Sequence, residues 1–204
     1  MEREGIIFVV SAPSGTGKTT LCKELIDFFP DLRQSVSFTT RAMRPAEKAG
    51  RDYHFVSASS FAMMVDKGEF AEWAAVHGHY YGTALAPLDA CRQNGCDVLL
   101  DIDFQGAEQL RRNYSHAVFI FIVPPDMVEL ERRLRLRGTE SDEVINNRLE
   151  NARSELQAGD WYDYLVTNDD FDRALSKLKA IVIAEACKRS RIPFSVAELV
   201  GLSV

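Results

Sequence analysis

The chain has 204 residues, of which 46% are hydrophobic and 26% charged, with a formal net charge of −6. This length and composition suit one soluble globular domain with a sizeable core and room for inserted lobes. The acidic balance argues against non-specific binding to nucleic acid or to an anionic membrane surface. The 4 cysteines form no C-x-x-C pair, and no apolar run is long enough for a signal peptide or a membrane span. We therefore expect a cytoplasmic protein with reduced thiols.

An apolar run at residues 6–10 leads into a glycine-containing turn and then into a segment with helical spacing. The turn and first helical residues are Ala12, Pro13, Ser14, Gly15, Thr16, Gly17, Lys18, Thr19 and Thr20. The two glycines allow successive N–H groups to point at one anion, and the helix N-terminus adds unpaired amides. Lys18 is placed to reach the β- and γ-phosphates, and the Thr19 hydroxyl to ligate Mg²⁺. The usual pattern begins with glycine, where this chain has Ala12. We predict a loop that binds a nucleoside triphosphate with Mg²⁺; the alternative is a chance Gly/Ser/Thr loop before a helix.

Short apolar runs without polar alternation are typical of buried parallel strands. They occur at residues 6–10, 98–102, 118–123 and 164–167. Helical patterns separate them, at residues 18–29, 85–94, 104–113, 127–137, 143–157 and 172–188. This alternation predicts an α/β fold with a doubly wound parallel sheet, whose ligands lie at the carboxyl ends of the strands.

Two regions interrupt the alternation. Residues 35–83 are rich in β-prone and aromatic segments, with a turn at Gly78, which predicts an inserted β-rich lobe. Residues 127–148 are dense in arginine and broken at Gly138, so we expect two helices joined by a hinge-like turn, with Thr139 and Asp142 resembling a capping box, as a helical lid. The predicted division is a core at 1–34, 85–125 and 151–204, a lobe at 35–84 and a lid at 126–150.

Arg41 and Arg44 follow a predicted strand of the lobe. Pro45 disfavours a helix at Arg44, so an extended loop leaves both guanidiniums able to converge, and the planar arginine fork suits phosphate. Tyr53 and Tyr81 add phenolic donors in the same region. From the pattern alone, such arginines can equally be solvated on the surface, and both interpretations stay open.

Glu72 lies in an otherwise apolar strand of the predicted hairpin. If Phe70 and Glu72 share a face, as the period of a strand requires, the carboxylate points to the aromatic side, where it needs hydrogen-bond donors. Guanine offers two adjacent donors, N1–H and the exocyclic amine, and Ser37 and Thr83 can supplement the contacts to the base. The alternative, which the pattern alone favours, is a glutamate at a sheet edge in water.

Segments in order along nearly the whole chain carry a resemblance to one family. They are residues 12–19, 35–41, 50–55, 69–73, 80–83, 100–106, 137–140, 147–149 and 168–170. By these segments the chain is similar to the guanylate kinase family of P-loop nucleoside monophosphate kinases. The resemblance implies a P-loop core, a GMP-binding lobe and a lid, with ATP and GMP as substrates and Mg²⁺ as cofactor. Besides Ala12, the chain departs from the family pattern at Met43 and Ala46, where proline and glycine are usual.

The resemblance also implies roles for single residues. Ser37, Glu72 and Thr83 would read the guanine, and Arg41, Arg44, Tyr53 and Tyr81 would hold the GMP phosphate. Asn168 would lie beside the adenine of ATP. We further assign Gly82, Asp101 and Asp103 to the GMP side, and Thr20 and Arg133 to the ATP side. The two aspartates are also candidates for orienting metal-bound water.

The implied reaction is ATP + GMP ⇌ ADP + GDP. The attacking group is a phosphate oxygen, so no general base is required, and catalysis depends on alignment and on cations around the transferring group. The predicted catalytic residues are Lys18, Arg44, Arg137 and Arg148. For Arg132 and Arg135 we expect solvated pairs with nearby glutamates. Two alternatives stay open, a non-catalytic guanylate-kinase-like interaction module and a kinase with another acceptor. The sequence leaves the oligomeric state open.

Overall fold

The structure is a computed structural model that describes residues 3–76, 78–136, 141–193 and 195. Strand β1 (Ile7–Ser11) is the middle strand of a five-stranded sheet with the order β2-β7-β1-β8-β9. The other strands are β2 (Leu32–Gln34), β7 (Asp97–Asp101), β8 (Val118–Val123) and β9 (Tyr164–Thr167). Neighbouring strands of this sheet pair in parallel, so their carboxyl ends lie at one edge.

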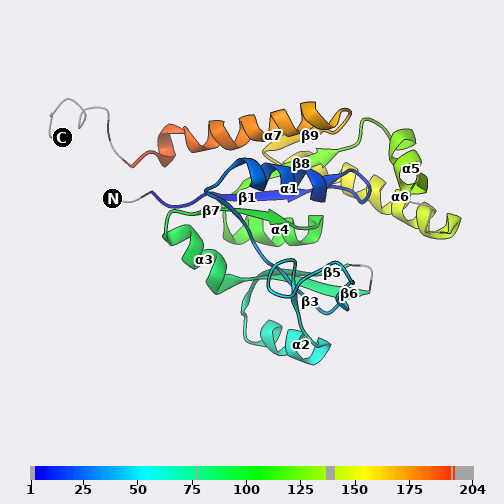
Figure 1. Ribbon diagram of the computed structural model, residues 1–204, viewed down its shortest axis with the longest axis horizontal. Coiled ribbons are helices and arrows are strands. Elements are labelled where there is room, and N and C mark those ends of the chain that lie inside the picture. The colour runs from blue at the N-terminus through cyan, green and yellow to red at the C-terminus, as the bar shows by residue number, and fades with distance from the viewer. Residues whose placement is uncertain (1–2, 77, 137–140, 194, 196–204) are drawn as a thin grey trace.

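Helices cover both faces of this sheet (Figure 1). Side chains alternate along β1, so that Phe8 and Val10 pack with α1 (Lys18–Phe28) and α7 (Phe171–Ala186). Ile7 and Val9 face α3 (Leu85–Gln93) and α4 (Phe104–Asn113) on the other side. This is the doubly wound arrangement that the sequence predicts. Only β2 is missing from the predicted strands, because two of its three residues are exposed polar side chains.

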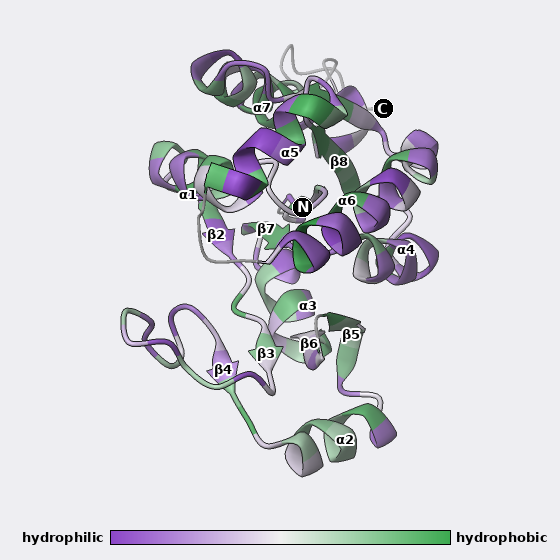
Figure 2. Cartoon of the chain, turned by 90° about the vertical axis from the view of Figure 1, so that its right-hand side faces the viewer, coloured by the Kyte–Doolittle hydropathy of each residue, from purple (hydrophilic) through white to green (hydrophobic). Residues whose placement is uncertain are grey.

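A second sheet, in the order β4-β3-β6-β5, lies apart from the first (Figure 2). Its strands are β3 (Phe38–Thr39), β4 (His54–Phe55), β5 (Phe70–Val76) and β6 (His79–Ala84). Helix α2 (Ala58–Asp66) packs on it through Phe61, which stacks on Phe70 and Tyr80. These strands and α2 are called the lobe below. The predicted turn at Gly78 is present and has a φ of +80°.

A bulge in β5 determines which side chains share a face of the lobe. Phe70 pairs with Ala84, whereas Glu72 pairs with the adjacent Thr83, so the register shifts between them. Since neighbouring residues of β6 point to opposite faces, Phe70 and Glu72 do so as well. The prediction that these two side chains share a face is therefore wrong. Phe70 lies on the outer face with α2, and Glu72 lies on the inner face.

The arginine-rich region forms α5 (Met127–Leu136) and α6 (Asp142–Gln157), which share an apolar cluster of their own. Ser141 caps α6 by accepting the N–H of Val144. The predicted break and capping residues Gly138 and Thr139 lie outside the described residues. Single turns follow α6 and α7, at Gly159–Trp161 and Arg189–Arg191. Among the described residues, no helix combines the length and apolarity that a membrane crossing requires.

Replacing Leu25 by alanine should lower the free energy of unfolding by about 2–5 kcal/mol. Leu25 is fully buried in α1 beneath the core sheet, and its removal leaves a cavity. Ile183→Ala is the control, because Ile183 on α7 is 52% exposed and its loss should change stability by less than about 0.5 kcal/mol. Urea titrations followed by circular dichroism compare the two; equal losses would contradict the assignment of Leu25 to the core.

Candidate functional site

The loop at residues 12–19, called the phosphate loop below, joins the carboxyl end of β1 to α1. Gly15 and Gly17 both have a φ of +94°, a conformation that side-chain-bearing residues rarely adopt. The N–H and hydroxyl of Thr16 both donate to the carbonyl of Pro13, at 3.2 and 2.7 Å, and close the turn. Gly17 is the N-cap of α1 and has no side chain to accept from the first amides. The helix N-terminus is therefore left to bind an anion.

Residues of α5 and of the segment that follows β9 support the phosphate loop. Asn168, at the end of β9, is buried and donates its amide to the carbonyl of Thr16 at 2.6 Å. Arg133 of α5 donates to the backbone carbonyl of Asn168 at 3.0 Å, so the two residues assigned to ATP lie together. A β-carbon at Gly15 would lie 2.8 Å from Cδ2 of Leu134, which means that α5 packs directly on the loop. The structure thus places the Asn168 side-chain amide on the loop itself.

Lys18 reaches the neighbouring strand β7. Val10 pairs with Asp101, which brings the aspartate beside the loop, and Lys18 Nζ lies 2.8 Å from Asp101 Oδ1 and 2.6 Å from the carbonyl of Ile102. Burial lowers the pKa of Lys18, but the charge and hydrogen bond of Asp101 raise it more, and the net pKa lies above its ordinary value. Lys18 is therefore held in its charged form at the end of the sheet.

The two candidate aspartates have different places. Asp101 pairs with Lys18, whereas Asp103 caps α4 by accepting the N–H of Gly106 at 2.9 Å. Thr19 and Thr20 are exposed in the first turn of α1. The hydroxyl of Thr19 and the carboxylate of Asp101 are hard oxygen donors of the kind that Mg²⁺ prefers together with phosphate oxygens. The residues present thus fit a magnesium ion brought with a nucleotide.

The inner face of the lobe carries the residues predicted to read a base. Glu72 is 3% exposed, and its Oε1 accepts the hydroxyl of Thr83 at 2.6 Å. Burial raises the pKa of Glu72 to about 7, although the bond from Thr83 opposes this. Phe38 pairs with Gly82, so the preceding Ser37 lies next to Thr83 in the register. Gly82 itself makes room for Phe70 on the outer face, where a β-carbon would lie 2.9 Å from the ring.

The predicted phosphate-binding residues of the lobe lie close together except Arg44. The guanidinium of Arg41 lies 5.3 Å from the ring centroid of Tyr53, which in turn is 5.9 Å from that of Tyr81. Glu47, which the sequence analysis missed, accepts both Nη atoms of Arg41 at 2.7 and 3.0 Å and also the N–H of Arg44. The paired Glu47 raises the pKa of Arg41 above its ordinary value. The side chain of Arg44 is exposed. The feature of the sequence that could have identified Glu47 is its position as an acidic residue three places after Arg44.

The lid brings one predicted catalytic arginine to the phosphate loop. Arg148 Nη1 of α6 donates to the hydroxyl of Ser14 at 3.3 Å. Arg132 pairs with Glu129, and Arg135 with Glu131 and Asp142, as expected for solvated helix pairs. The remaining prediction, Arg137, lies outside the described residues.

Glu155 is a further residue that the sequence analysis missed. It lies seven residues after Arg148 and therefore on the same side of α6. Burial raises its pKa to about 7, an effect that the nearby charge of Lys18 opposes and that of Asp103 reinforces. The seven-residue spacing between Arg148 and Glu155 is the feature of the sequence that could have identified Glu155.

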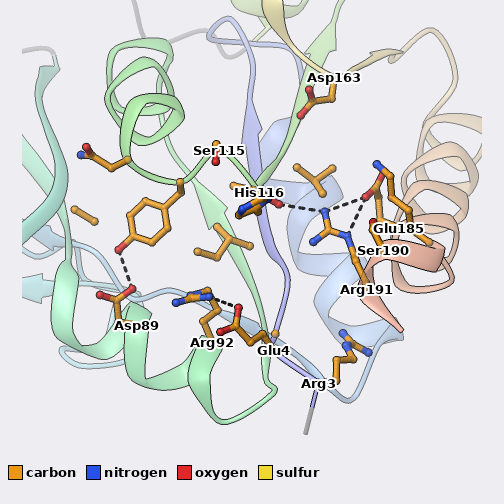
Figure 3. A pocket seen from close by; sticks show the side chains of 18 of the residues that line it. Arg3, Glu4, Asp89, Arg92, Ser115, His116, Asp163, Glu185, Ser190 and Arg191 are labelled. Carbon is orange, nitrogen blue, oxygen red and sulfur yellow. Dashed lines mark hydrogen bonds and ion pairs between the residues drawn. The ribbon is translucent and has the colours of Figure 1, made fainter. Parts of the chain in front are cut away.

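A hollow of about 1340 Å³ lies at the other end of the core sheet. It is lined by residues at the amino ends of β1 and β8, such as Ile7 and Val118. Three arginines line it and each is paired: Arg92 with Glu4, and Arg191 with Glu185 and the carbonyl of His116 (Figure 3), while Arg3 pairs with Asp97. The phosphate loop and the Lys18–Asp101 pair lie at the opposite end, at the carboxyl ends of β1 and β7.

Comparisons with known proteins show the family to which the chain belongs. The family model for guanylate kinase matches residues 5–185. The chain belongs to the guanylate kinase family. Guanylate kinase of Geobacter metallireducens is 54% identical over 97% of this chain and 98% of its own length. That of Syntrophotalea carbinolica is 58% identical over 94% of this chain and 91% of its own. The crystal structure of guanylate kinase from Anaplasma phagocytophilum superposes with a TM-score of 0.80, at 35% identity, and covers 98% of this chain and 95% of that chain. The family relationship thus spans the P-loop core, the lobe and the lid helices.

The raised pKa of Glu72 predicts a pH dependence of stability in this guanylate kinase family member. Between about pH 4.5 and pH 7 the folded state keeps a proton that the unfolded state has lost, so stability falls as the pH rises through this window. Glu72→Gln removes this loss, and we expect its unfolding free energy relative to wild type to increase from about pH 5 to about pH 8, by up to about 3 kcal/mol.

Urea titrations across this range measure the difference. Glu108→Gln, an exposed position on α4, is the control and should show no such trend. The raised pKa of Glu155 also lowers stability as the pH rises, but Glu155 is present in both proteins, so its effect cancels in the difference between them. A difference between Glu72→Gln and wild type that stays constant with pH would contradict the assignment.

Proposed function

We propose that this chain is an ATP:GMP phosphotransferase, which transfers the γ-phosphoryl group of ATP to GMP and yields ADP and GDP. The observation that carries the proposal is Glu72: its carboxylate is buried, and among the described residues the side chain that donates to it is the hydroxyl of Thr83, which bonds Oε1. The second carboxylate oxygen of Glu72, Oε2, is also a buried acceptor and needs hydrogen-bond donors. Guanine has N1–H and the exocyclic amine side by side, whereas adenine presents an acceptor at N1. The family relationship independently supports the same acceptor.

On the ATP side, the phosphate loop binds the triphosphate with its amides and with the dipole of α1. Lys18 is charged and pairs with the carboxylate of Asp101. When ATP binds, the ammonium group of Lys18 would contact oxygens of the β- and γ-phosphates in place of this carboxylate. Thr19, with Asp101 nearby, would hold Mg²⁺, which supplies charge neutralisation for the phosphates when bound. Asn168 donates to the loop and Arg133 donates to Asn168; we keep the proposal that Asn168 lies beside adenine and that Arg133 belongs to the ATP side.

On the GMP side, Arg41, Tyr53 and Tyr81 would bind the phosphate of GMP, and their closeness in the lobe supports this role. We propose that Arg44 turns in from the surface to join them. Ser37, Thr83 and Glu72 then bind the base on the inner face of the lobe. In this view residues 35–84 form the GMP-binding lobe, residues 126–150 the lid, and the remaining segments the core.

The acceptor phosphate is anionic, so the protein supplies alignment and positive charge in place of a base. Lys18 and Arg148 approach the phosphate loop from α1 and from the lid, and Arg44 and Arg137 complete our catalytic set. Closure of the lid would also exclude water, which otherwise hydrolyses ATP. The free thiols of the 4 cysteines and the substrates ATP and GMP suit a cytoplasmic enzyme.

ADP release in the presence of ATP and Mg²⁺ should depend on GMP and be far weaker with AMP. Glu72→Gln should lower kcat/KM for GMP by up to about 10⁴-fold, because the acceptor becomes a mismatched amide. Glu108→Gln serves as the matched control and should keep wild-type activity. Equal use of GMP and AMP by the wild type would contradict the guanine assignment. Absence of any GMP-dependent release would favour the interaction-module alternative.

Arg148→Ala should reduce kcat by roughly 10³-fold, while the KM for GMP changes little, since the arginine acts on the transferring phosphoryl group. Arg153→Ala on the same helix is the control, because Arg153 is exposed and paired with Glu150. Steady-state kinetics on both variants test this. If both arginines cost the same, the role of Arg148 is structural only.

A further inference from the structure

The carboxylate of Glu72 lies at the contact between the lobe and helix α4 of the core. Its Oε1 accepts the hydroxyl of Thr83 within the lobe. Its Oε2 faces Gly106 in the first turn of α4, where an added β-carbon would lie 2.3 Å from Oε2 and 3.0 Å from the carboxylate carbon. No side chain fits between the helix and the carboxylate at this position. Glycine at 106 is what allows Glu72 to sit where it does.

The backbone of Gly106 does not explain why this residue is glycine. Gly106 is helical and is not one of the glycines with positive φ. Inside a helix, glycine is less favourable than alanine. Its amide donates to Asp103, a bond that any residue except proline can make. The reason for glycine at position 106 is therefore that its lack of a side chain leaves room for the carboxylate of Glu72.

Gln109 makes a second contact between α4 and this part of β5. Its side-chain amide donates to the carbonyl of Trp73 at 2.7 Å and accepts the N–H of Trp73 at 3.2 Å. Strand β5 is the edge of the lobe sheet, so Gln109 takes the place of a neighbouring strand. Gly106 and Gln109 are three residues apart and hence on one side of α4.

Ala71 completes the contact between β5 and α4. It packs with Ala107 and Leu110 in the apolar cluster on this side of the core sheet. The three successive residues Ala71 to Trp73 are thus all held by α4, one by packing, one by the space at Gly106 and one by the Gln109 amide. The bulge that turns Glu72 to the inner face lies in the same stretch.

We infer that Gly106 and Gln109 are positioning residues for guanine recognition, and that α4 sets where Glu72 presents its carboxylate to the base. This inference rests on the proposed function. An alanine at 106 must move the carboxylate from 2.3 Å to the 3.4 Å at which ordinary contact begins, a shift of roughly 1 Å. A misplacement of that size at a binding site can cost about 100-fold.

Kinetics with each substrate varied in turn test the inference. Gly106→Ala should raise the KM for GMP by about 10- to 100-fold and leave the KM for ATP within about 2-fold of wild type. Gln109→Ala should also raise the KM for GMP, but by less, because Gly106 still leaves room for the carboxylate of Glu72. Glu108→Ala, between them on α4 and exposed, is the control and should match wild type.

Glu72→Asp distinguishes positioning from damage to the helix. The shorter side chain withdraws from position 106, so it should weaken GMP binding in the wild-type background but lower the KM for GMP when added to Gly106→Ala. A helix that is merely destabilised would raise the KM for both substrates and would gain nothing from Glu72→Asp. Thermal unfolding of each variant confirms that it is folded.

Two results would overturn the inference alone: a KM for GMP in Gly106→Ala within about 2-fold of a GMP-responsive wild type, or a full additive loss from Glu72→Asp in both backgrounds. A wild type without GMP-dependent ADP release would instead overturn the proposed function, and this inference with it.

Discussion

The parallel pairing of β1 with β7 and β8 is the constraint on which the whole site depends. Because the strands run in one direction, their carboxyl ends lie at one edge, and the segments predicted to bind nucleotides leave the sheet there. The phosphate loop follows β1, Asp101 ends β7 and α4 follows it, the predicted lid helices follow β8, and Asn168 follows β9. Residues far apart in sequence thus meet at this edge, as Asn168 and Thr16 illustrate with a separation of 152 residues.

An acidic protein that binds two phosphorylated substrates needs its cations held in place. In this structure three of the half-buried site cations are paired with a carboxylate: Lys18 with Asp101, Arg41 with Glu47, and Arg133 with Glu129. These pairs keep the cations charged and oriented, and a phosphate can take over their hydrogen bonds on binding. Local pairs of this kind reconcile a net charge of −6 with anion binding.

Helix α4 links the two halves of the site. Asp103 caps it next to the phosphate loop, and its first two turns hold Ala71, Glu72 and Trp73 of the lobe. The buried Glu72 is energetically costly to ionise, and it is held between Thr83 and a helix turn without a side chain. The position of this carboxylate therefore depends on the core as much as on the lobe, since Thr83 lies in the lobe and Gly106 in the core.

The sequence alone determined the α/β fold, the phosphate loop and most helix bounds, because these depend on local periodicity and on glycine conformations that neighbours along the chain dictate. It also indicated the pairs Arg132–Glu129 and Arg135–Glu131, which follow from helix spacing. Only the tertiary structure decided that Phe70 and Glu72 face opposite ways, since the bulge in β5 arises from pairing with β6. It likewise decided the partners of Asn168, Arg41 and Gly106, because contacts between residues distant in sequence depend on how the elements pack and leave no period in the chain.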